Sequence, residues 1–134
     1  MRVTHQRITI ISARRPAKTL NDELQWFGNS LGLFNLRDKD KSCFRVFIEL
    51  LKAAKLDKPL TSDEIAHKLG LTRGTVVHHI NRLMDSGIVI HQQKRYMLRA
   101  NNLEMLTDEI RKDSERAFDD LRKVAKEIDQ LLGL

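Results

Sequence analysis

The segment from Thr72 to Asp85 carries the side chains best suited to contacting an external partner. Its periodicity predicts a helix whose inward face holds the apolar residues Val76, Ile80 and Leu83. At about 100° per residue, the opposite face presents Gly74, His78 and Asn81 and carries no acidic side chain. Hydrogen-bond donors, an apolar contact and a glycine that permits close approach are what base edges and phosphates require. In this arrangement Asn81 can pair with adenine and Val77 can meet a thymine methyl group.

Candidate DNA contacts fall into three groups along the chain. Those in and around the predicted helix are Thr72, Arg73, Gly74, Thr75, Val77, His78, Asn81 and Arg82. Two more, at the tip of a predicted hairpin that follows, are Lys94 and Arg95. Three further basic residues in the N-terminal arm, which could grip the backbone, are Arg14, Arg15 and Lys18.

A second helix must lie just before this one to hold it in place. Thr61 and Glu64 form a capping box, in which Thr61 covers a free amide and Glu64 reaches back. Gly70 ends the helix that they open, and Thr72 caps the next helix. Two short helices joined by a turn that contains glycine are typical of a helix-turn-helix unit.

A β-hairpin is predicted after the second helix. Residues 88–91 and 95–99 are its two strands, with Ile88 and Ile90 at alternate positions of the first and Tyr96 and Leu98 at alternate positions of the second, and a polar, basic tip separates them. Placed after a helix-turn-helix, such a hairpin is a wing, and its tip would reach the phosphate backbone or the adjacent minor groove.

Residues 42–100 resemble the winged helix-turn-helix domain of prokaryotic transcriptional regulators of the ArsR/MarR/TrmB kind, archaeal ones in particular. The residues that carry the resemblance are Leu60 to Ala66, Leu69 to Thr72, Thr75, Val76, Ile80, Leu83 and Asp85 to Val89. The resemblance implies that the helix from Arg73 is a recognition helix. The chain departs from the family at Gly74, in the absence of a paired-cysteine metal motif, and over its first forty residues.

Three further elements are predicted before the helix-turn-helix unit. A short strand is predicted over residues 6–12, a helix capped by Asn21 over the next segment, and a central helix over residues 40–55 with Cys43 as a small core residue. We therefore expect residues 1–20 to form a basic arm with a short strand. Residues 21–100 should form the winged domain, with the recognition helix at 72–86 and the wing at 88–99.

Residues 101–134 predict one long helix, capped by Asn101 or Asn102. Its apolar stripe is too long to be buried on a small winged domain. A homodimer formed through this helix is the simplest solution, and a helix folded back on its own chain is the alternative. The predicted fold class is thus mainly α with a small β-hairpin: a winged helix-turn-helix with a long C-terminal dimerisation helix.

Charge and composition agree with a nucleic-acid partner. The 134 residues carry a net charge of +6, and residues 1–20 hold basic but no acidic side chains. One cysteine excludes an intrachain disulfide, and no apolar run reaches the roughly 20 residues of a membrane span. We expect a cytoplasmic protein.

Catalytic chemistry finds little support in the sequence. His78 and His79 are adjacent and would point in different directions on a helix, so they cannot share one metal ion. There is no glycine-rich phosphate loop and no nucleophile elbow. We expect no enzyme activity, no metal and no cofactor, but a small-molecule effector could bind between the N-terminal and C-terminal helices. The alternative function is a winged-helix protein-interaction module in a multisubunit assembly, for which Trp26 is the candidate contact.

Overall fold

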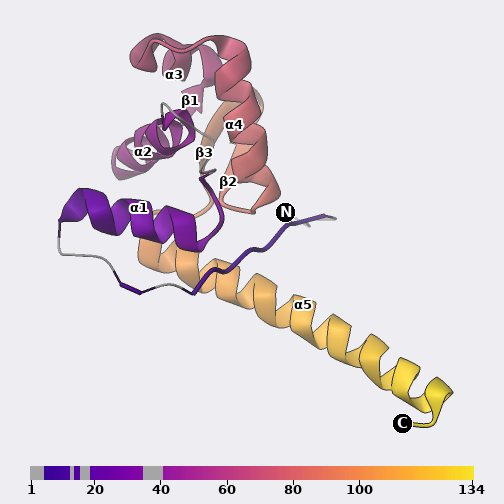
Figure 1. Cartoon of the computed structure of the whole chain (residues 1–134). Coiled ribbons are helices and arrows are strands. Elements are labelled where there is room, and N and C mark those ends of the chain that lie inside the picture. Colours follow the sequence, from indigo (N-terminus) through magenta and orange to yellow (C-terminus); the bar gives the residue numbers. More distant parts are fainter. Residues whose placement is uncertain (1–4, 13, 16–18, 35–40) are drawn as a thin grey trace.

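The computed structural model describes residues 5–12, 14–15, 19–34 and 41–134 (Figure 1). Its elements, in chain order, are α1 (Leu20–Ser30), α2 (Ser42–Lys55), β1 (Leu60–Thr61), α3 (Ser62–Leu69), α4 (Arg73–Asp85), β2 (Val89–Gln92), β3 (Arg95–Leu98) and α5 (Leu103–Leu132). Helices α2, α3 and α4 pack together beside the sheet, and α5 runs away from them as a single long helix (Figure 1). The expected fold class, a winged helix-turn-helix with a long C-terminal helix, is confirmed.

Polar caps fix where four of the helices begin. The side chains of Thr19, Thr61, Thr72 and Asn102 each accept a hydrogen bond from a backbone amide in the first turn of α1, α3, α4 and α5. Each such cap is worth about 1 kcal/mol. The prediction that Asn21 caps the first helix is wrong, because the helix begins two residues earlier and Thr19 lies at the position from which an oxygen reaches the Asp22 amide.

A single apolar core joins α2, α3, α4, the wing and the start of α5. Phe47 and Leu50 of α2 are buried against the apolar faces of α3 and α4. Leu98 of β3 and Leu106 of α5 belong to the same cluster. Cys43 is fully buried, as expected of a small core residue.

The sheet has three antiparallel strands in the order β1-β3-β2. The hairpin β2–β3 was predicted, whereas the two-residue strand β1 was not. In β1, Leu60 pairs with Tyr96 and Thr61 pairs with Arg95. This pairing brings the residue that caps α3 directly beside the wing.

The strand expected over residues 6–12 does not form. Residues 5–12 carry no strand, and their described backbone-to-backbone hydrogen bonds go to the ends of helices. The Arg7 amide donates to the carbonyl of Asp85 (2.8 Å), and the Ile11 amide donates to that of Ser30 (2.7 Å). The last carbonyls of a helix lack partners within the helix. The segment therefore satisfies the C-terminal ends of α4 and α1 instead of a sheet edge.

An ionic cluster, formed by Asp113 with Arg99, Gln6 and Arg116, anchors α5 to the rest of the molecule. Both oxygens of Asp113 accept hydrogen bonds from Arg99, and Gln6 and Arg116 each donate one more. Burial alone raises the pKa of the Asp113 carboxyl. The hydrogen bonds from Arg99 and Gln6, with the charges of Arg99 and Arg116, outweigh burial and hold that pKa below its ordinary value.

Two helical glycines in the fold have opposite surroundings. A Cβ added to Gly28 in α1 would lie 1.8 Å from the ring of Phe34, whereas a Cβ added to Gly74 in α4 would meet nothing within 4 Å. Gly28 is therefore needed for packing, and Gly74 is not.

We expect Gly28→Ala to lower the free energy of unfolding by about 1–3 kcal/mol through overpacking. Gly74→Ala should raise the free energy of unfolding by about 0.5–1 kcal/mol, because alanine is the better helix former. Urea denaturation followed by circular dichroism measures both changes. A stabilising effect of alanine at both positions would contradict the close packing of Gly28 on Phe34.

Candidate nucleic-acid interface

Helix α4 presents two different faces. Its residues Val76, Ile80 and Leu83 are fully buried, as the periodicity predicts. His79 is also buried, and its Nε2 lies 2.6 Å from the Ser42 hydroxyl of α2, which ties α4 to the central helix. The residues that were predicted to face outward are exposed or half-buried: Arg73, Gly74, Thr75, Val77, His78, Asn81 and Arg82. Burial of one face therefore turns the other face to solvent.

The first turn of α4 can receive an anion. Thr72 caps it, and the Thr72 hydroxyl donates to Thr75 Oγ1 at 2.8 Å. No acidic residue lies in this turn. The free amides and the positive end of the helix dipole favour negative charge there, and a phosphate is one such ligand. Arg45 of α2 holds the preceding turn by donating to the Leu69 carbonyl at 2.6 Å.

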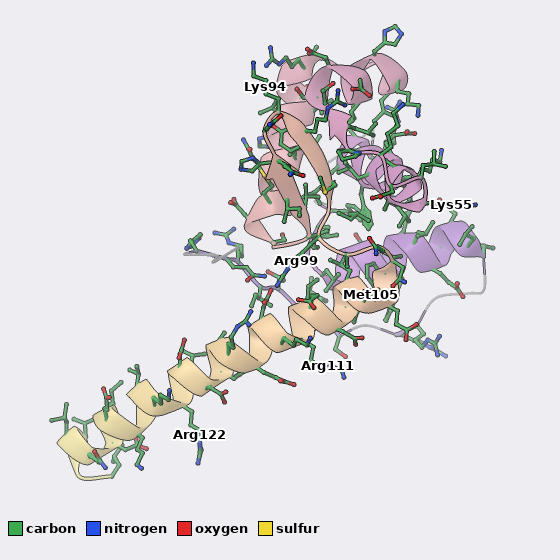
Figure 2. All side chains as sticks on the ribbon, turned by 180° about the vertical axis from the view of Figure 1, so that it is seen from behind. Lys55, Lys94, Arg99, Met105, Arg111 and Arg122 are labelled. Atoms are coloured by element: carbon green, nitrogen blue, oxygen red, sulfur yellow. The ribbon has the colours of Figure 1, made fainter. Side chains whose placement is uncertain are left out.

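The wing tip lies at the same end of the domain as the turn between α3 and α4 (Figures 1 and 2). Gln93, with a φ of 58°, and Lys94 make the turn between β2 and β3. The Lys94 side chain is exposed and extends outward at that tip (Figure 2). Among the described residues, no hydrogen bond or ion pair holds it. Lys94 can therefore reach a partner without breaking an internal contact.

Arg95 is held by the protein itself. Its Nη1 donates to Glu64 Oε1 at 3.2 Å and to the Pro59 carbonyl at 3.3 Å. The Glu64 oxygen also accepts from the Thr61 hydroxyl. Glu64 thus links the cap of α3 to the wing, where the sequence predicted only a link back to the cap.

A second acid–arginine pair lies nearby, between Asp63 of α3 and Arg73 of α4 (3.7 Å). Both acid–arginine pairs are exposed, so each contributes at most about 1 kcal/mol and can open at low cost. The sequence did not reveal Asp63 and Glu64 as partners of these arginines. Residues 31 positions apart in the chain, such as Glu64 and Arg95, meet only through the β1–β3 pairing.

The described residues of the basic arm lie away from the first turn of α4. Arg14 and Arg15 are exposed, and they follow a segment that is bonded to the C-terminal ends of α4 and α1. The structure therefore does not bring them to the first turn of α4. Lys18, the third arm residue, lies outside the described residues.

Other sites receive no support from the described residues. Across residues 5–12, 14–15, 19–34 and 41–134, no three histidine, cysteine or acidic side chains are grouped so that they could hold a metal ion. Within these ranges no helix is both long and apolar enough to cross a membrane. A cavity of about 40 Å³ lies between the end of α2 and β3, which is room for little more than a water molecule. The effector site between the N-terminal and C-terminal helices stays a prediction.

Comparison with known proteins agrees with this geometry. Residues 48–90 match the model of a family described as winged helix-turn-helix DNA-binding. The chain is also 28% identical over 85 residues to the HTH-type transcriptional activator ArnR1 of Sulfolobus acidocaldarius. That match covers 63% of this chain and 30% of the relative's length. No solved structure matches the chain. The domain built from α2, α3, α4 and the wing is a winged helix-turn-helix.

Proposed function

We propose that the chain is a sequence-specific regulator of transcription that binds double-stranded DNA as a homodimer. In this proposal α4 enters the major groove, and the wing lies on the backbone or in the adjacent minor groove. The matched DNA-binding family and the activator named above support the proposal. It is a binding function, with no catalytic step assigned to the chain.

The observation that carries the proposal is a glycine at position 74 that the fold itself does not require. It lies in the first turn of a 13-residue helix, where glycine costs about 1 kcal/mol relative to alanine. Neither a positive φ nor a close neighbour within the chain requires it. A close approach by something outside the chain explains why the helix lacks a side chain there. The groove wall of DNA is such a surface, since no acidic residue lies in the first turn of α4 and the neighbouring Arg73 is a donor.

The contacts divide by the chemistry of their side chains. Thr72, Thr75 and Arg82 suit phosphates, while Val77, His78 and Asn81 suit base edges. Arg73 and Arg95 begin in pairs with Asp63 and Glu64, so they exchange an internal carboxylate for a phosphate on binding. Lys94 needs no such exchange. The arm residues Arg14, Arg15 and Lys18 remain candidates for flanking backbone.

Fluorescence anisotropy of a random duplex of about 30 base pairs, titrated at two salt concentrations, tests DNA binding. We expect micromolar affinity that falls steeply with salt, since released counterions drive phosphate contacts.

Lys94→Ala should flatten the logarithmic salt slope by about one unit. Gly74→Ala should weaken binding although it stabilises the fold. Lys123→Ala, which removes the same charge from the far part of α5, is the matched control and should change neither quantity.

Absence of binding by the parent protein at low salt would overturn the proposal. The protein-interaction module would then be favoured, and Trp26, whose indole N–H is buried without a hydrogen-bond partner among the described residues, would become its first candidate contact.

Asn81 tests whether the sequence of the DNA is read. After selection of a preferred duplex from a random pool, Asn81→Ala should cost about 1–3 kcal/mol of binding free energy on the selected site and little on random DNA. The same anisotropy titration measures both. Equal losses on the two duplexes would remove Asn81 from base recognition.

The homodimer is supported by the far half of α5. From residue 115 onward every side chain of this helix is exposed. The apolar ones recur every three or four residues and so form one face: Phe118, Leu121, Val124, Ile128 and Leu131. A second copy buries the same face by symmetry. Such a dimer places two recognition helices about 34 Å apart, one turn of DNA.

Leu121→Glu should convert the dimer to a monomer, because it introduces two carboxylates into an apolar contact related by symmetry. Sedimentation equilibrium measures the mass, and Gln130→Glu on the opposite side of the helix is the control. The affinity of the monomer for a single half-site should remain, while that for a palindrome falls. A dimer that persists in Leu121→Glu would contradict the interface.

A further inference from the structure

We propose that Asp113 is a positioning residue: it fixes the direction in which α5 leaves the winged domain, and so the separation of the two recognition helices in the dimer. The second half of this inference rests on the proposed function. The first half stands on the contacts of Asp113.

Asp113 is the last point at which α5 is deeply buried. Its side chain is only 3% exposed, whereas all residues from 115 to 134 are exposed. Upstream, Leu106 and Ile110 pack on the core. No described contact to the domain restrains the helix beyond this region, so its direction is set between residues 103 and 114.

Two other segments of the chain, together with the next turn of α5, supply hydrogen bonds to the Asp113 carboxylate. Arg99 reaches it from the end of the wing, with Nη2 at 3.0 Å from Oδ1. Gln6 reaches Oδ2 from the N-terminal segment at 2.9 Å. Arg116 donates from the next turn of α5 itself.

The first two of these partners are themselves fixed to the wing and to α4. The Arg99 amide donates to the Ile88 carbonyl (2.9 Å), and its Nη1 donates to the Gly87 carbonyl (3.4 Å). The Gln6 amide group also donates to the Ser86 carbonyl at the end of α4 (3.2 Å). Asp113 therefore ties α5 to the base of the wing and to the end of the recognition helix together. Figure 2 shows Arg99 between the hairpin and α5.

Burying the charged Asp113 carboxylate of α5 costs desolvation free energy. Apolar residues of similar size often stabilise a protein as well or better, and a best-attested role of buried polar groups is to select one geometry among several. An apolar side chain at position 113 would continue the stripe of Leu106 and Ile110, but it could slide on the core. A carboxylate held from three directions admits one arrangement.

The length of the free part of α5 makes this geometry matter. Residues 115–132 span about 27 Å, at about 1.5 Å per residue. A tilt of about 10° at Asp113 then moves the far end by about 5 Å, which exceeds the roughly 3.4 Å between base pairs. To select one half-site spacing, the attachment of α5 at Asp113 must therefore hold the direction of the helix to within less than about 10°.

The direction of α5 can be measured without DNA. Spin labels at Gln92→Cys and Lys123→Cys report the distance between wing and tail by double electron–electron resonance, with excess unlabelled chain so that only distances within one chain are read. The native cysteine is fully buried and stays out of reach of the label. We expect a narrow distribution in the parent chain and in the control Asp119→Asn, and one at least about twice as wide in Asp113→Asn. A parent-like width and mean in folded Asp113→Asn would overturn the inference.

If Asp113→Asn does not fold, the pair Arg99→Met with Asp113→Leu replaces the charges by apolar packing. The same broadening is expected of this double variant, and a narrow distribution at the parent distance would overturn the inference.

The consequence for DNA is read on two copies of the selected half-site with the spacer varied one base pair at a time. The parent should prefer one spacing by about tenfold, and the Asp113 variants by less than about threefold, at equal affinity for a single half-site. If the parent binds no DNA, the proposed function fails, but the spin-label distances still test whether Asp113 fixes the direction of α5. If the parent is selective and the variants are equally selective, the assignment of Asp113 fails alone.

Discussion

The structure depends on burial of one face of α4 against α2 and α3. Val76, Ile80 and Leu83 are removed from water, and a helix that buries one stripe must present the opposite stripe to solvent. His79, bonded to Ser42, fixes the rotation of α4 about its own axis. The orientation of Gly74 and Asn81 is therefore a consequence of core packing. It does not depend on any contact that those two residues make.

The exposed ion pairs and the buried ion pair of this fold have different roles. The exposed pairs of Asp63 with Arg73 and of Glu64 with Arg95 are weak, and their arginines can exchange partners. The Asp113 carboxylate is buried, and its pairing with Arg99 cannot be broken without leaving a buried charge uncompensated. The exposed, exchangeable ion pairs thus lie at the proposed DNA-binding face, and the buried ion pair lies where the long helix is attached.

Local signals predicted the central elements well. Capping residues at Thr61, Thr72 and Asn102 and the stop at Gly70 act within one helical turn, so they can be recognised in the sequence. Residues 6–12 show the limit of such reasoning. Their alternating pattern is that of a strand, but the hydrogen-bond partners near them are the ends of α4 and α1, which no local pattern reveals. Strand β1 was missed for a related reason, since two residues carry no periodicity.

From the sequence one could tell which residues of α4 face inward, which face outward, and that the wing tip is basic. Periodicity and charge are local properties, and folding preserves them. Tertiary structure alone decided that Glu64 meets Arg95, that the N-terminal segment reaches the end of α4, and that Arg99, Gln6 and Asp113 converge beneath the wing. These contacts join residues separated by tens to more than a hundred positions, and the packing of the elements brings them together. The direction of α5 belongs to the second group, because it is set by contacts that α5 makes with the wing and the N-terminal segment and not by its own helical pattern.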